Sequence, residues 1–136
     1  VDFHEIPLVP DTPVVSDKLV SIVAYPVVHL IPAIGLRMTN QQTGKVLVYT
    51  SDTMRDPGVV YLARDADILI HEATGEYYGH STGADAAYDA VEANAKRLVL
   101  IHYPSVRGDP GAVLEEARAI FKGPVELAQD FNAYEF

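Results

Sequence analysis

The stretch Asp-Ile-Leu-Ile-His-Glu-Ala-Thr at 67–74 decides the fold class of this chain. Its apolar run predicts a short buried strand that delivers a histidine and a glutamate at its end. A second apolar strand at 98–101 also ends on a histidine, His102. Apolar residues at three- and four-residue steps over 81–95 predict a helix between these two strands. Strands that alternate with helices indicate a layered α/β fold.

The same pattern extends toward both ends of the chain. Proline follows aspartate at 56–57 and at 109–110, and both pairs predict helix starts because proline suits the first helical turn. Turn-forming residues predict a loop at 9–17 and leave 1–18 irregular. In chain order, the expected elements are strands at 19–28, 34–39, 45–50, 67–70, 98–101, 125–128 and 131–136, and helices at 56–66, 81–95 and 109–121.

Composition excludes several classes of protein. The 136 residues form one domain over 1–136, and the apolar fraction of 49% excludes a disordered tail. A net charge of -9 argues against broad, non-specific nucleic-acid binding. The absence of cysteine excludes disulfides, thiolate metal sites and a cysteine nucleophile. The longest apolar run is broken by proline, histidine and glycine, so no membrane span is expected. No export signal is visible, which leaves the cytoplasm as the default location.

Polar, reactive residues follow the predicted strands that end at 50, 70 and 101. Ligand sites of open α/β sheets collect at the carboxyl ends of strands. Histidine and carboxylate side chains without thiolates suit zinc, manganese or iron in a hydrolytic site. The candidate residues are His29, Asp52, Glu72, His80 and His102.

Each candidate also has an ordinary structural interpretation. His29 could be a buried histidine in an apolar strand, and Asp52 could start a turn or cap the next helix. Glu72 could pair with a cation, and His80 could be a surface loop residue. A rival motif, Gly-His-Ser-Thr-Gly at 79–83, matches the nucleophile elbow of serine esterases. The esterase is disfavoured because residues 73–78 separate the serine from the preceding strand.

Taken in order, these segments resemble the metallo-β-lactamase superfamily and, within it, the ribonuclease Z-like branch. The likeness covers nearly the whole chain after residue 19. The first matching segments are a strand at 25–37 that bears a histidine, a glycine and an arginine, and Thr-Ser-Asp-Thr at 50–53, which corresponds to the family's (S/T)-G-D-T. The others are the strand with His-Glu-Ala-Thr at 67–74, His-Ser-Thr at 80–82, the strand that ends at His102, and the segment 126–131.

The resemblance implies a role for each candidate. His29 would bind a first metal ion, Asp52 would bridge two ions, and His102 would bind the second. His80, supported by Glu72, would stabilise or protonate the leaving oxygen. The implied cofactors are two divalent metal ions, zinc by default, with manganese or iron as alternatives.

The first departures from the family concern parts of the fold and of the metal site that this sequence lacks. The family's principal ligand motif, H-x-H-x-D-H, lies in the preceding half of its αββα sandwich and is absent, since the only earlier histidine is His4. The chain therefore resembles the second half alone, a mixed sheet with helices on one face. Such a half would leave the inner sheet face exposed and the metals short of ligands. We infer a fragment, a cleaved chain or a natural half that needs a complementary amino-terminal half or partner chain, and that is inactive alone. The family's dimers suggest a homodimer by analogy.

Two further departures concern the substrate. A tight turn at 40–44 stands where ribonuclease Z enzymes usually carry a long tRNA-gripping arm, and the segment 103–108 lacks the family's usual arginine–tyrosine pair. A metal-dependent hydrolase of a small phosphodiester or other ester is therefore the leading hypothesis. The alternatives are a tRNA 3′ processing endonuclease, with RNA as substrate, and a non-catalytic half-domain that binds a partner.

Overall fold

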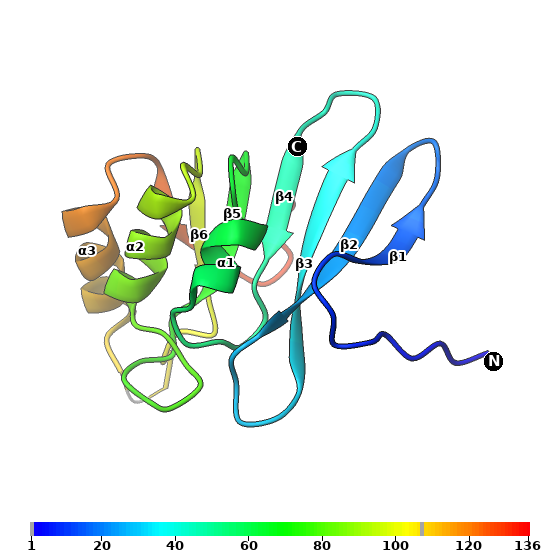
Figure 1. Ribbon diagram of the computed structural model, residues 1–136. Coiled ribbons are helices and arrows are strands. Elements are labelled where there is room, and N and C mark those ends of the chain that lie inside the picture. Colours follow the sequence, from blue (N-terminus) through cyan, green and yellow to red (C-terminus); the bar gives the residue numbers. More distant parts are fainter. Residues whose placement is uncertain (1, 107) are drawn as a thin grey trace.

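The computed structural model describes residues 2–106 and 108–136. Val1 and Arg107 lie outside the described residues, so the segment 103–108 is described except at Arg107. The described residues form one sheet of seven strands with three helices (Figure 1). The elements are β1 (Thr12–Ser16), β2 (Val20–Val27), β3 (Ala33–Asn40), β4 (Val46–Tyr49), α1 (Pro57–Leu62), β5 (Ile68–Glu72), α2 (Gly83–Glu92), β6 (Leu98–Ile101), α3 (Pro110–Ile120) and β7 (Val125–Leu127).

The pairing of the strands changes from antiparallel to parallel at β4. Strands β1 to β4 pair in antiparallel fashion, and β4 to β7 pair in parallel. The strands lie side by side in the order in which they occur along the chain. The parallel half needs a crossover between each pair of strands, and α1, α2 and α3 supply these crossovers. The mixed α/β sheet predicted for the second half of the sandwich is confirmed.

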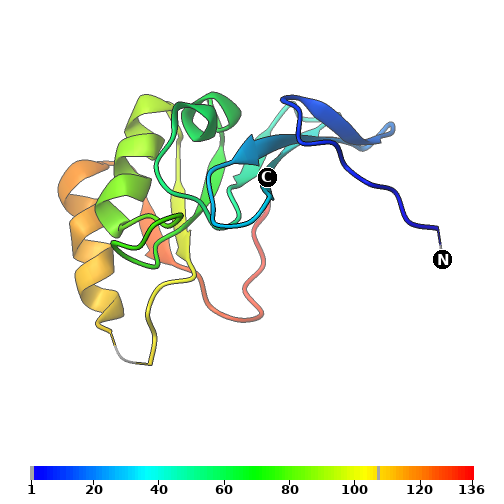
Figure 2. The same cartoon turned by 60° about the horizontal axis from the view of Figure 1, so that its bottom comes forward.

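All three helices pack on one face of the sheet (Figure 2). The core on this side joins alternate strand residues such as Val48, Leu69 and Leu100 to α1 and α2. α2 presents a face of alanines to the sheet, Ala86, Ala87 and Ala90, which are fully buried. Small side chains let a helix approach a sheet closely. The helix starts follow the predicted caps, with Asp56 and Asp109 before proline, and with a Thr82–Asp85 capping box at α2.

The opposite face of the sheet is partly covered by the carboxy-terminal segment. Leu47, Ile68 and Val99 point to this side and are buried against Tyr134 and Phe136. The expected exposure of the inner face is reduced in this part of the sheet, because the apolar tail lies across it (Figure 2). The predicted strand at 131–136 is also wrong, since this segment packs on the face of the sheet and pairs with no strand.

The amino-terminal prediction needs one correction. Residues 12–16 were expected to be irregular, but they form β1 and pair with β2 across a β-bulge near Pro13 and Val15. Long-range pairing overrides the local preference of proline and aspartate for turns. Arg37 has a structural role that spacing could not show: it donates hydrogen bonds of 2.8 Å to the carbonyls of Leu62 and Arg64 at the end of α1. Within the described ranges, we find no helix whose length and apolarity would let it span a membrane.

Candidate metal centre

Five segments converge at the carboxyl edge of the parallel strands. Asp52 follows β4, Glu72 is the last residue of β5, and His102 directly follows β6. His29 lies in the connection from β2 to β3, and His80 lies in the loop that leads into α2. The parallel register brings the three strand ends to one edge, so residues far apart in the sequence meet there.

The three histidine rings form a compact cluster. The ring centroids of His29 and His80 are 4.8 Å apart, and those of His80 and His102 are 5.6 Å apart. Candidate ligand atoms of His29, Asp52 and His80 lie within 4.8 Å of one another, and the same holds for Glu72, His80 and His102. These separations suit side chains that share a small cation between them.

Each ring is held through its Nδ1 atom. The Nδ1 of His29 lies 2.8 Å from the carbonyl oxygen of Gly79, which can only accept, so this nitrogen carries the proton. The Nδ1 of His80 lies 2.9 Å from Glu72 Oε1, and that of His102 lies 2.9 Å from Asp52 Oδ1. Second partners of this kind set the tautomer of a metal-binding histidine and leave Nε2 for the ion.

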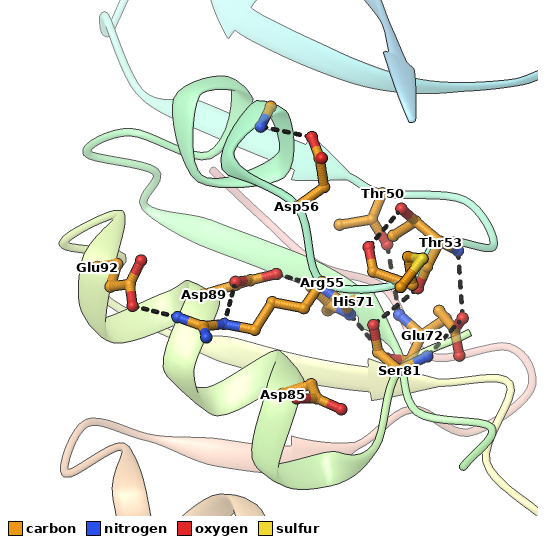
Figure 3. Close-up of polar contacts among 12 residues, drawn as sticks. Thr50, Thr53, Arg55, Asp56, His71, Glu72, Ser81, Asp85, Asp89 and Glu92 are labelled. Atoms are coloured by element: carbon orange, nitrogen blue, oxygen red, sulfur yellow. Dashed lines mark hydrogen bonds and ion pairs between the residues drawn. The ribbon is translucent and has the colours of Figure 1, made fainter. Parts of the chain in front are cut away.

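Glu72 is the polar centre of the site. Its carboxylate is fully buried, and Oε1 accepts hydrogen bonds from His80 and from the backbone amides of Thr53 (3.2 Å) and Ser81 (3.1 Å). Oε2 accepts from the amide of Thr74 at 2.8 Å. One carboxylate thus fixes the loop after β4, the loop before α2 and the end of β5 (Figure 3). Four donors compensate for the desolvation of its charge.

The loop that carries Asp52 is bound to the loop that carries His29. The amide of Met54 donates to the carbonyl of Val28 at 2.9 Å, and the amide of Val28 donates to Thr53 Oγ1 at 3.2 Å. Ser51, next to Asp52, has a φ of 60°, and His102 has a φ of 53°. Such left-handed conformations cost free energy for residues other than glycine and gather at functional sites.

Gly79 shows why one position in the His80 loop must be glycine. Its φ is +83°, and a Cβ atom built there would lie 2.9 Å from Nδ1 of His29. The absence of a side chain lets the loop carbonyl reach the His29 ring. Sequence reasoning did not identify Gly79 or Thr74 as partners of the site, because both act through contacts between segments distant in sequence.

The structure settles the position of the other candidates. His71 points away from the cluster, toward Asp89 on α2. Ser81 is fully buried and donates through Oγ to the carbonyl of Thr53 at 2.7 Å, so its hydroxyl is not presented as a nucleophile. His4 lies in the exposed amino-terminal segment. The five predicted site residues lie together, and their individual roles stay predictions.

The donor set fits a divalent cation. Three imidazoles with fixed Nδ1 protons and two nearby carboxylates are the ligand types that zinc and related ions prefer. His102 and Asp52 keep 50% and 38% of their side-chain surface exposed, so ligands from another segment can reach them.

Comparison with known proteins supports this assignment. No model of a protein family matches the chain. The ribonuclease Z of Cyanothece sp. is 46% identical over 108 residues, covering 69% of this chain and 33% of that protein. The ribonuclease Z of Archaeoglobus fulgidus is 38% identical over 104 residues, covering 70% of this chain and 34% of that protein. The chain is ribonuclease Z-like and belongs to the metallo-β-lactamase superfamily.

Solved structures of the superfamily share this architecture. The metallo-β-lactamase fold protein YhfI from Bacillus subtilis superposes with a TM-score of 0.78 at 27% identity, over 88% of this chain and 51% of YhfI. The short form of human tRNase Z gives a TM-score of 0.67 at 29% identity, over 89% of this chain and 45% of tRNase Z. The chain spans about a third of the length of the ribonuclease Z relatives it matches. Membership of the metallo-β-lactamase superfamily implies divalent metal binding.

Proposed function

We propose that this ribonuclease Z-like chain supplies one half of a metal-dependent hydrolase that acts on a phosphodiester or another ester. The observation that carries the proposal is the cluster of three histidines whose Nδ1 atoms are all engaged by acceptors of the chain. Rings held through Nδ1 leave Nε2 available to a cation.

His29, Asp52 and His102 are the proposed metal ligands, with Asp52 shared between two zinc ions. Bound there, the ions would lower the pKa of coordinated water and neutralise charge on the phosphoryl oxygens. The chain's own groups orient the remaining chemistry. Glu72 accepts a hydrogen bond from Nδ1 of His80 and so fixes the orientation of the ring. The opposite nitrogen, Nε2, can then give a proton to the leaving oxygen of the ester.

A complementary half completes the proposed site. The ligands of the H-x-H-x-D-H motif are absent from this sequence, so a preceding segment, a partner chain or a second subunit must supply them. We expect the chain alone to bind zinc weakly and to hydrolyse nothing. Robust phosphodiester turnover by the isolated chain would refute this requirement.

A chimera tests the function directly. This chain would replace the matching third of the Cyanothece ribonuclease Z, whose 46% identity favours correct packing. We expect about two zinc ions per molecule by elemental analysis and hydrolysis of bis(p-nitrophenyl) phosphate. Asp52→Asn should abolish both, whereas His4→Ala, in the exposed amino-terminal segment, should change neither. A folded chimera that binds no metal would favour the non-catalytic, partner-binding alternative.

A second candidate is tRNA 3′ processing. The identity to ribonuclease Z proteins favours it. The tight turn between β3 and β4 and the net charge of -9 leave little in this chain to hold tRNA. Cleavage of a precursor tRNA by the chimera at a rate that exceeds its turnover of small phosphodiesters would select this candidate.

A further inference from the structure

A chain of polar contacts centred on the buried carboxylate of Asp89 lies behind the histidine cluster, on the helix side of the sheet. Asp89 on α2 is fully buried and has two partners, Arg55 and His71. Arg55 Nε lies 3.0 Å from Asp89 Oδ1, and His71 Nε2 lies 3.3 Å from Asp89 Oδ2. Arg55 also contacts Glu92 through Nη2. Figure 3 shows Arg55 reaching across to α2, with His71 beside Asp89.

His71 connects this chain to Glu72. Its Nδ1 lies 2.7 Å from the carbonyl oxygen of Glu72, and its ring is fully buried. Both partners of the His71 ring are acceptors, a carbonyl and a carboxylate. Each ring nitrogen thus lies within hydrogen-bond distance of an acceptor. The ring is therefore fixed at both nitrogens, which sets the backbone of β5 where Glu72 begins.

Asp89 ties together the three segments that carry the proposed chemistry. Arg55 lies three residues after Asp52, in the connection from β4 to α1. His71 immediately precedes Glu72, and Asp89 lies on the helix whose amino terminus follows His80. One carboxylate thus links the connection after β4, the end of β5 and helix α2.

Stability alone explains these contacts poorly. Burying the Asp89 carboxylate costs desolvation free energy that offsets much of its attraction to Arg55, so their ion pair contributes little net stability. Burial lowers the pKa of Arg55, but the charges of Asp89 and Glu92 outweigh this effect and raise it above its ordinary value. Arg55 thus remains a permanent cation for Asp89. Catalytic groups must be held to within about 0.5 Å, and loops rarely achieve this without supporting contacts.

We propose that Arg55, Asp89 and His71 are positioning residues that set the geometry of Asp52, Glu72 and His80. None of the three touches the space between the histidine rings. They act through the loop that carries Asp52 and through the backbone of Glu72. The expected effect on zinc affinity rests on the proposed function. The expected effect on the His80 ring does not, because it can be measured without metal.

The first experiment examines the metal-free chain labelled with ¹⁵N-histidine. Long-range ¹H–¹⁵N spectra report which nitrogen of each ring carries the proton. We expect a single Nδ1–H form of His80 in the unmodified chain, and mixed or broadened signals in Asp89→Asn. The matched control is Glu92→Gln, which removes the more exposed partner of Arg55 (52% exposed) and should leave His80 unchanged. A residue that acted on stability alone would lower the unfolding midpoint without altering His80 in the folded chain.

The second experiment titrates zinc alone into the same proteins. Loss of a supporting contact commonly lowers metal affinity ten- to a hundredfold. We expect Asp89→Asn to weaken zinc binding about tenfold, and Glu92→Gln to change it less than about twofold. Arg55→Gln, at a side chain that is 39% exposed, replaces Asp89→Asn if the latter does not fold. If the unmodified chain, which lacks the ligands of the complementary half, binds no measurable zinc, the His80 spectra alone decide the positioning role. Unchanged His80 signals in the folded variant would overturn the inference.

Discussion

Replacing Glu72 by glutamine should strongly destabilise the chain, although the two side chains have nearly the same shape. The carboxylate accepts four hydrogen bonds, three at Oε1 and one at Oε2. Glutamine has only one acceptor atom. Its best orientation places oxygen where Oε1 lies and turns the amide group toward the backbone N–H of Thr74, so two donors face each other.

The cost follows from these contacts. A donor left unsatisfied costs about 1–3 kcal/mol, and three charge-assisted bonds become weaker neutral ones. We expect a loss of about 2–4 kcal/mol in the free energy of unfolding, a large share of the roughly 5–15 kcal/mol typical of a domain. Urea unfolding followed by circular dichroism measures this loss. Glu116→Gln, on the exposed side of α3, is the matched control and should change stability by less than about 0.5 kcal/mol. A similarly small change for Glu72→Gln would refute the assignment of Glu72 as the anchor of the site.

Three further predictions concern backbone strain and pH. Ser51→Gly should stabilise the chain by about 0.5–1 kcal/mol in urea unfolding, because glycine adopts the φ of 60° without steric cost; a destabilised variant would contradict the strain argument. Gly79→Ala should lower zinc affinity, measured by competition with a chelator, because the new methyl group meets the His29 ring; an unchanged affinity would contradict it. The hydrogen bond from Lys96, together with that from the amide of Val46, lowers the pKa of Asp67 below 3.8. Its stabilising contribution should therefore be complete above about pH 4 and disappear as pH falls through the lowered pKa, so unfolding of Asp67→Asn should depend less on pH in that range than unfolding of the unmodified chain.

The parallel core of the fold could be predicted from the sequence because local patterns determine it. Apolar runs mark β5 and β6, and the Asp-Pro pairs mark α1 and α3. β1 could not be predicted, since its pairing with β2 depends on a contact between segments and overrides a turn-rich sequence. The predicted strand at 131–136 was wrong for a related reason. Apolar residues predict that a segment is buried, but they do not show whether it pairs as an edge strand or packs on the face of the sheet.

The site residues could be predicted from the sequence, whereas the contacts that support them could not. The five site residues were identified by their place after strands and by family motifs. Their supporting contacts were not, because hydrogen bonds such as His29 to Gly79 and His71 to Asp89 join residues that no short sequence pattern relates. Ser51 is instructive, because the family motif has glycine there and the structure supplies the reason in a left-handed φ.

The sequential order of the sheet has a consequence for biosynthesis. Each strand has as its neighbour the strand made just before it, so the sheet can grow one strand at a time as the polypeptide leaves the ribosome. The entropy lost on closing each connection is smaller than in a sheet whose neighbouring strands are made further apart. We therefore expect the sheet to form progressively on the nascent chain, so that arrest of translation after β6 should already yield a protease-resistant intermediate.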